Sequence, residues 1–147
     1  MKPTILFDID GTIADIRHRR HFLDGANPDW RSFNSKMGDD TPNRPVVSLY
    51  RTLWESHNFQ IILVSGRGEE SRKITETWLT WNSIPFDRLL MRPKGDFRSD
   101  VVIKQELLDQ LQKEGAQISF VVDDRNSVVN MWRRNGITCL QCAEGDF

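Results

Sequence analysis

Residues 4–12 read Thr-Ile-Leu-Phe-Asp-Ile-Asp-Gly-Thr, a short apolar run that ends in two carboxylates and a glycine. The apolar residues before Asp8 suit a strand that is buried on both faces, as in a parallel α/β sheet. Because side chains alternate along a strand, Asp8 and Asp10 lean the same way at the same end of it. Open α/β sheets bind ligands at the carboxyl ends of their strands. This stretch therefore predicts both the sheet and a polar site at its edge.

The composition is that of an ordinary globular domain. The chain has 147 residues, is 38% hydrophobic and carries five Trp and eight Phe, enough for a packed core. Its net charge of −1 gives no overall attraction to nucleic acid, so such affinity must come from a local patch. No apolar run has the length of a membrane span, and the first residues lack signal-peptide organisation. We expect a cytoplasmic protein with no membrane association and no evident obligate protein partner.

Strand and helix patterns alternate along the rest of the chain. Strands are predicted at 59–64, 89–91, 118–122 and 137–141. The helices between them start at Pro45 as the first helical residue, around 72–81, at Asp100 as a cap and at Asn126 as a cap, the last one ending at Gly136. This order predicts a right-handed, mostly parallel sheet with helices on both faces. We expect one domain, 1–147, with a small flap at about 13–44.

A pair of tryptophans and a pair of cysteines are expected to have structural roles. Trp78 and Trp81 share a helix with Ile74, and we expect both tryptophans to be core residues rather than a base-stacking surface. Cys139 and Cys142 lie three apart on a predicted strand, so they face opposite sides and have poor geometry for a disulfide. No second Cys/His pair completes a zinc site. We therefore expect buried strand cysteines.

Polar residues follow the predicted strands or lie near a helix start at four places. They are the pair Asp8/Asp10, the stretch Ser65-Gly66-Arg67, Lys104 and the pair Asp123/Asp124. This set, in this order, resembles the haloacid dehalogenase superfamily of phosphotransferases, and Asp-x-Asp-Gly-Thr at 8–12 is its most specific part. The resemblance implies a Rossmann-like three-layer sandwich with a minimal cap after the first strand. It also implies a phosphatase that works with Mg²⁺ through an aspartyl-phosphate.

The resemblance implies a role for each of these groups. Asp8 is the candidate nucleophile, and Asp10 the general acid that then serves as base. Ser65 and the Gly66 amide would donate to the phosphoryl oxygens, and Lys104 would offset the charge of Asp8 and the phosphoryl group. Mg²⁺ would be held by Asp8, the backbone carbonyl of Asp10, Asp123 and Asp124. Which of the last two touches the metal directly stays open, with the strand-ending Asp123 as first choice.

The carboxyl-terminal third indicates a substrate class. Residues 95–104, 122–136 and 144–147 resemble the phosphatase domain of bacteriophage polynucleotide kinase-phosphatases, which removes 3′-phosphates from nucleic-acid ends. The chain has no Gly-x-x-x-x-Gly-Lys-Ser/Thr, so we expect a phosphatase without kinase activity. Two alternatives stay open: a 5′-nucleotidase of (deoxy)nucleoside monophosphates, and a non-catalytic nucleic-acid-binding module.

Several further residues are candidates for contact with the substrate. Thr12, Gly66, Arg67 and Arg125 are candidates because they belong to or adjoin the motifs, although either arginine could instead orient Asp123 or Asp124. In the flap, Arg17 and Arg20 could clamp phosphates while Trp30 or Phe33 contacts a base. The same segment could equally be a solvated basic helix face whose aromatics pin the flap to the core.

The room for a cap is limited. Only twelve residues separate Met91 from Lys104, too few for a cap domain at that position. The segment 13–44 is long enough for a small helical flap but not for a folded lid. Such an open site suits the end of a polymer and does not exclude a mononucleotide.

Overall fold

The computed structural model describes residues 1–147 and is built around a five-stranded parallel sheet. Its strand order is β5-β4-β1-β6-β7. The strands are β1 (Thr4–Phe7), β4 (Gln60–Gly68), β5 (Arg88–Arg92), β6 (Ile118–Asp123) and β7 (Cys139–Gln141). The five predicted strands are therefore present, with differences at their ends.

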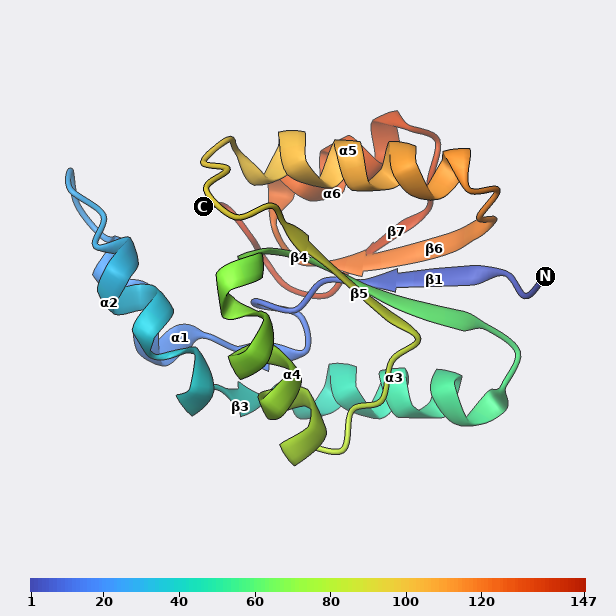
Figure 1. Cartoon of the computed structure of the whole chain (residues 1–147), viewed down its shortest axis with the longest axis horizontal. Coiled ribbons are helices and arrows are strands. Elements are labelled where there is room, and N and C mark those ends of the chain that lie inside the picture. The colour runs from blue at the N-terminus through green and yellow to red at the C-terminus, as the bar shows by residue number, and fades with distance from the viewer.

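Helices cover both faces of the sheet (Figure 1). On one face lie α3 (Arg44–Ser56) and α4 (Arg72–Trp81), and on the other α5 (Asp100–Lys113) and α6 (Asn126–Arg134). Each pair of helices closes its own apolar core against the sheet. The predicted three-layer α/β sandwich is thus confirmed. No helix of the structure is both long enough and apolar enough to span a membrane.

Strand β1 lies at the centre of the fold and is buried on both faces. Ile5 and Phe7 belong to the core under α3 and α4, whereas Leu6 between them belongs to the core under α5 and α6. All three side chains have no solvent exposure. Phe7 is paired with Leu63 of β4 and Val122 of β6, so the polar residues that follow the three strands emerge side by side.

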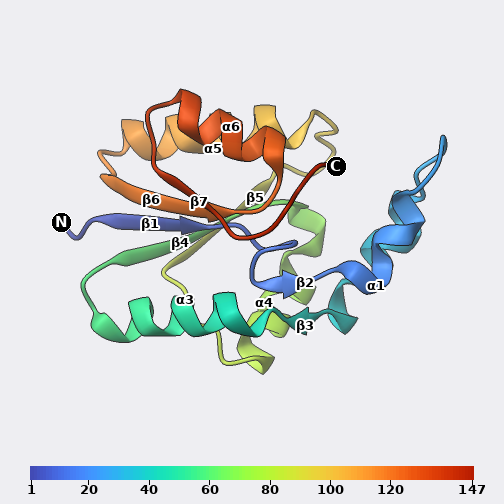
Figure 2. The same ribbon diagram turned by 180° about the vertical axis from the view of Figure 1, so that it is seen from behind.

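Residues between β1 and α3 form the flap, which projects beyond the carboxyl edge of the sheet (Figures 1 and 2). It contains β2 (Ala14–Asp15), α1 (Arg17–Arg20), η1 (His21–Leu23), α2 (Trp30–Ser35), η2 (Met37–Asp39) and β3 (Thr41–Pro42). At its base, β2 and β3 pair antiparallel. Phe33 and Met37 are buried, whereas Trp30 is 54% exposed. Of the two aromatics, Phe33 is therefore the one that pins the flap.

Three helix starts differ from the sequence predictions by one residue. Helix α3 begins at Arg44, so Pro45 is its second residue. Ser99, not Asp100, caps α5, with its side chain accepting from the Val102 amide. Helix α6 begins at Asn126, which is therefore helical rather than a cap. In α5 the shift matters, because it leaves the Asp100 carboxylate available to other groups.

Two predicted core positions are wrong. Trp81 is 86% exposed, because the buried face of α4 is formed by Thr75, Trp78 and Leu79 and the last residue of the helix lies off that face. Cys139 is buried in β7, but Cys142 lies beyond the end of the strand and is only partly buried. Both thiols are free, as expected.

Candidate active site

Three buried carboxylates converge at the carboxyl edge of the sheet. Asp8 follows β1, Asp123 ends β6 and Asp124 comes directly after it. One carboxylate oxygen of each lies within 4.8 Å of the others. The chain passes from one side of β1 to the other between β5 and β6, so this cluster lies at the topological switch point where open sheets bind ligands.

Asp8 is held from both sides. The ammonium group of Lys104, on α5, donates to Oδ1 of Asp8 at 2.7 Å, and the hydroxyl of Thr12 donates to Oδ2 at 2.9 Å. Burial raises the pKa of Asp8 well above its usual value, and Asp123 raises it further. Lys104 opposes this rise, and its own pKa is raised by Asp123 and Asp8 although burial acts against its charge. The carboxylate has a fixed orientation and one positive partner.

The two acids at the end of β6, Asp123 and Asp124, differ in their hydrogen bonding. Asp123 accepts from Lys104 at 3.0 Å and from the indole of Trp132 at 3.1 Å through Oδ2, and from the Asp124 amide at 2.8 Å through Oδ1. Asp124 has one contact, the Thr12 hydroxyl at 3.4 Å from Oδ1. Burial and the Asp123 charge raise the pKa of Asp124. The carboxylate of Asp124 therefore has fewer hydrogen-bond partners than that of Asp123, which was the first choice from the sequence for direct contact with the metal.

Gly11 explains why the first motif needs a residue without a side chain. Its φ is +81°, and a Cβ there would lie 2.1 Å from Oδ2 of Asp124. Any other residue would strain the backbone, and its side chain would collide with the carboxylate of Asp124. Thr12, a candidate substrate residue, has no solvent exposure and contacts Asp8 and Asp124 instead. We assign it to the orientation of these carboxylates.

Asp10 has a different environment from Asp8. Its Oδ1 accepts from Arg67 at 2.7 Å and from Arg19 at 2.8 Å, and a quarter of its side chain is exposed. Burial alone would raise the pKa of Asp10, but Arg67 and Arg19 outweigh it and lower the pKa to about 2. Two carboxylates on the same motif are therefore pushed in opposite directions, which is a common sign of different chemical roles.

A second carboxylate, Asp40, anchors both arginines. It comes from the end of the flap, immediately before β3, and is 5% exposed. Its Oδ1 accepts from Arg19 Nε at 2.8 Å and its Oδ2 from Arg67 at 3.1 Å. His18 also contacts Asp40, at 2.6 Å. Neither arginine is exposed, so Arg67 orients Asp10 rather than Asp123 or Asp124, and it has no open face for substrate.

The segment after Val64 lies next to the first motif and contributes Ser65 and Arg67 to the site. Residues Ser65 to Gly68 continue β4 with an irregular register instead of forming a separate turn. The buried Ser65 hydroxyl accepts from the Arg67 amide at 3.1 Å and keeps its own proton to donate. A Cβ on Gly66 would lie 2.6 Å from Asp100, so this glycine allows α5 to approach.

Four further arginines, which are exposed or partly buried, lie near the acidic cluster. Arg125 donates to Asp100 at 2.9 Å, and Arg92 also pairs with Asp100. Arg17 pairs with Asp15 at 2.6 Å and is largely exposed, whereas the guanidinium of Arg20 lies over the Phe147 ring. Arg17 and Arg20 both line a cavity that includes Asp124. The structure thus places Arg17, Arg20 and Arg125 near the site but not within the acidic cluster.

Three residues of the site were not singled out from the sequence: Arg19, Asp40 and Asp100. Arg19 lies among five consecutive basic residues, Arg17 to His21, of which it alone is fully buried. Nothing in the sequence distinguishes Asp40 from the neighbouring Asp39. Asp100 did carry a signal, because its spacing of four from Lys104 places both side chains on one face of α5.

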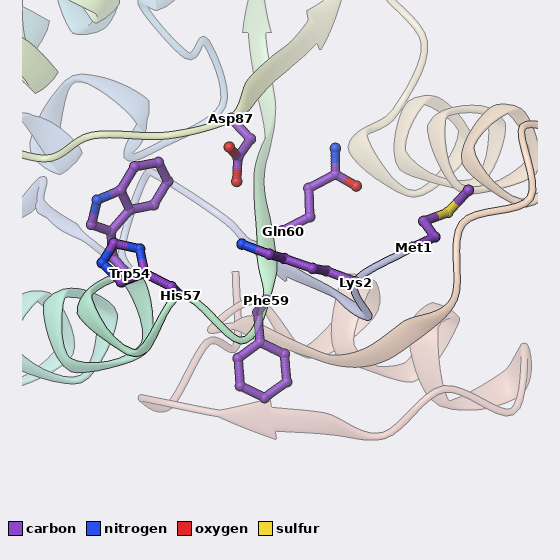
Figure 3. Close-up of a pocket in the computed structure, with 7 residues that line it drawn as sticks. All are labelled: Met1, Lys2, Trp54, His57, Phe59, Gln60 and Asp87. Carbon is purple, nitrogen blue, oxygen red and sulfur yellow. The ribbon is translucent and has the colours of Figure 1, made fainter.

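A second cavity lies away from this chemistry. It has a volume of about 340 Å³ and is lined by Met1, Lys2, Trp54, His57, Phe59, Gln60 and Asp87, as Figure 3 shows. These residues are at the amino ends of the strands, opposite the acidic cluster. Its one carboxylate, Asp87, accepts from the Ile61 amide at 2.8 Å and has a structural role.

Known proteins with similar sequences and structures agree with this geometry. The model of the family described as "Polynucleotide kinase PNKP phosphatase domain" matches residues 2–147. In the Pnkp1/Rnl/Hen1 RNA repair complex, one chain is 34% identical, with a TM-score of 0.81 over 99% of this chain and 44% of that chain. The "Putative bifunctional polynucleotide kinase/RNA ligase" of Autographa californica nuclear polyhedrosis virus is 28% identical over 130 residues, 88% of this chain and 17% of that protein.

More distant structures share the fold. The haloacid dehalogenase-like hydrolase SP0104 from Streptococcus pneumoniae is 14% identical, with a TM-score of 0.64 over 95% of this chain and 84% of that chain. The chain spans less than half the length of the two nearer relatives described above. A purely nucleic-acid-binding module, one of the alternatives from the sequence, is not supported. The chain is a phosphatase of the haloacid dehalogenase type and belongs to the family of polynucleotide kinase PNKP phosphatase domains.

Proposed function

We propose that this chain is a Mg²⁺-dependent phosphomonoesterase that removes 3′-phosphates from nucleic-acid ends. The observation that carries the chemistry is Asp8, buried between Lys104 and Thr12 and adjacent to Asp123 and Asp124. The family match over residues 2–147 supports the substrate class. Relatives named for polynucleotide kinase and RNA repair support nucleic-acid ends over free nucleotides.

The donor set fits a hard divalent cation. Three carboxylates share a buried space with a single ammonium group, so one negative charge or more is left unbalanced. The raised pKa values of Asp8 and Asp124 reflect this repulsion together with burial. Asp8, Asp124 and the Asp10 carbonyl would hold Mg²⁺. Asp123 would orient these ligands through its hydrogen bonds with Lys104 and the Asp124 amide. When bound, the ion neutralises charge on the phosphoryl oxygens.

The chain's own residues supply the remaining chemistry. An Asp8 oxygen attacks phosphorus, the ester P–O bond breaks, and the leaving oxygen takes a proton from Asp10. Water then attacks the phosphoaspartate, Asp10 takes its proton, and inorganic phosphate leaves as the acyl-phosphate P–O bond breaks. Ser65 donates its hydroxyl proton to a phosphoryl oxygen in both steps.

The arginine pair fits the alternating role of Asp10. Arg19 and Arg67 keep this carboxylate ionised in the free site, which is the form the second step needs. The negative charge of a phosphoryl group bound nearby would raise the pKa of Asp10, because a like charge disfavours ionisation. Asp10 would then carry the proton that the first step needs.

Replacement of Asp10 tests the acid role through the leaving group. We expect Asp10→Asn to slow phosphate release from a 3′-phosphorylated oligonucleotide by about 10²-fold, because the alkoxide then leaves without a proton. An aryl phosphate, whose phenolate leaves unaided, should lose far less in its first step. Burst kinetics with both substrates separate formation from hydrolysis of the phosphoaspartate. Equal loss in the first step for both leaving groups would contradict the acid role.

Removal of the metal gives a second prediction. We expect a chelator to abolish phosphate release and excess Mg²⁺ to restore it. Added Mg²⁺ should also raise the melting temperature, because a ligand that binds only the folded state stabilises it by about 2.7 kcal/mol at a concentration of 100 times its Kd. Asp124→Asn should lose this thermal shift, while Glu55→Gln, at an exposed position on α3, should keep it. A thermal shift that survives Asp124→Asn would place the ion elsewhere.

The substrate is tested by a direct comparison. Phosphate release in Mg²⁺ is measured from a 3′-phosphorylated oligonucleotide, from its 5′-phosphorylated counterpart and from deoxynucleoside monophosphates. Selective turnover of the 3′ end supports the proposal. Turnover of the monophosphates alone would assign the chain as a nucleotidase instead.

A further inference from the structure

The residues after β7 form a wall of a cavity beside the acidic cluster. They run along the carboxyl edge of the sheet toward the flap (Figure 2). The cavity has a volume of about 380 Å³, in the range of small-molecule sites. Gly11 and Asp124 contribute to it from the motif loops, Arg17 and Arg20 from the flap, and Cys142 and Phe147 from this carboxyl-terminal segment. The cavity therefore borders the acidic cluster at Asp124.

The backbone of this segment is fixed without help from the Phe147 ring. A Cβ on Gly145 would lie 1.9 Å from the carbonyl oxygen of Asp124, so the carboxyl-terminal segment packs directly against the backbone of Asp124. The Gly145 carbonyl accepts from the Asn126 amide at 2.9 Å, and the Phe147 carbonyl accepts from Arg125 Nε at 2.8 Å. These contacts position Phe147 relative to Asp124.

Part of the Phe147 residue nevertheless faces solvent. The residue is 45% exposed, so it does not serve as a core side chain. The guanidinium carbon of Arg20 lies 4.3 Å from the ring centroid, and that of Arg125 lies 5.4 Å away. Proteins that bind single-stranded nucleic acids use aromatic rings to stack on bases and nearby arginines to contact phosphates. The ring, the two cations and the cavity are held together beside a phosphatase site.

We propose that this cavity receives the nucleoside that carries the scissile phosphate, and that its base stacks on Phe147. The inference rests on the proposed function and adds a specificity element to it. The ribose and base enter between the flap and the carboxyl-terminal segment, and the phosphate reaches Asp8 past Asp124. Phe147 thus distinguishes nucleoside phosphates from other phosphate esters.

The test pairs a change in the protein with a change in the substrate. KM and kcat are measured for Phe147→Leu on two 3′-phosphorylated oligonucleotides that differ only in whether the terminal sugar bears a base. We expect the variant to raise KM about tenfold for the base-bearing substrate, because leucine removes the aromatic face on which the base stacks. For the abasic substrate KM should be high already in the wild type and should not change further.

Control variants separate stacking from packing. Phe147→Trp keeps an aromatic face and should restore the low KM. Phe97→Leu makes the same change in a ring that is 95% exposed on the loop before α5, and should have no effect. Equal changes on both substrates, or none on either, would overturn the stacking role while leaving the phosphatase proposal intact. A wild-type protein that releases no phosphate from any 3′ end would overturn both proposals.

Discussion

Asp8→Asn is expected to lower phosphate release by about 10⁴-fold or more, the scale of loss seen when a covalent nucleophile is removed. The amide keeps the shape of the side chain but cannot form the phosphoaspartate. Lys104 retains Asp123 as an ion-pair partner at 3.0 Å, so the fold should persist. Phosphate release and thermal unfolding of the same preparation check both parts. Binding of a 3′-phosphorylated oligonucleotide should also persist in the inactive variant.

Two comparisons make the Asp8 result specific. Glu55→Gln makes the same acid-to-amide change at an exposed position and should leave activity unchanged. Trapping of labelled phosphate on the wild-type protein after an acid quench, and its absence in Asp8→Asn, would connect the loss to the covalent step. An Asp8→Asn protein with more than about a hundredth of wild-type activity would point to direct attack by water.

Asp40→Ala is expected to have the largest effect on stability. Its carboxylate is the buried counter-charge for both Arg19 and Arg67, with N–O distances of 2.8 and 3.1 Å. Removing one partner of a buried ion pair costs about 3–5 kcal/mol, because the remaining charge stays desolvated. Here Asp10 still compensates part of the charge, so we expect a loss near the lower end of that range. Denaturant unfolding measures it.

The neighbouring residue provides the control. Asp39 is exposed, and Asp39→Ala should change the free energy of unfolding by less than about 0.5 kcal/mol. Asp40→Asn should fall between the two, since it retains shape and some hydrogen bonding without the charge. If Asp40→Ala proves as stable as Asp39→Ala, then water reaches the two guanidinium groups and the network contributes little.

The sheet and its acidic edge were predictable because their signals are local. Each strand is an apolar run, and each polar group follows a strand or lies on a helix within a few residues of it. Parallel pairing then brings Asp8 and Asp123 together without any further information, since Phe7 and Val122 are in register. The family resemblance was needed only for the roles of these groups.

The arginine network was not predictable, because it depends on contacts between distant segments. Helix α1 has four residues, too few for periodicity to show which of its basic side chains faces inward. Asp40 meets Arg67 only after the flap has folded back onto the sheet. The prediction that Trp81 is buried was wrong for a related reason. At the end of a helix, residue spacing alone does not establish whether another element packs against the side chain.

Trp132 connects the packing of the core to the geometry of the acidic cluster. Its indole ring is 1% exposed in the core beneath α5 and α6, yet its N–H donates to the carboxylate of Asp123. Every other residue is smaller than tryptophan, so a substitution at this position would change both the packing of the layer and the position of Asp123. A substitution of Trp132 therefore cannot change the stability of the core without also affecting the acidic cluster. Substitutions intended to raise the melting temperature should be made at other positions of this core.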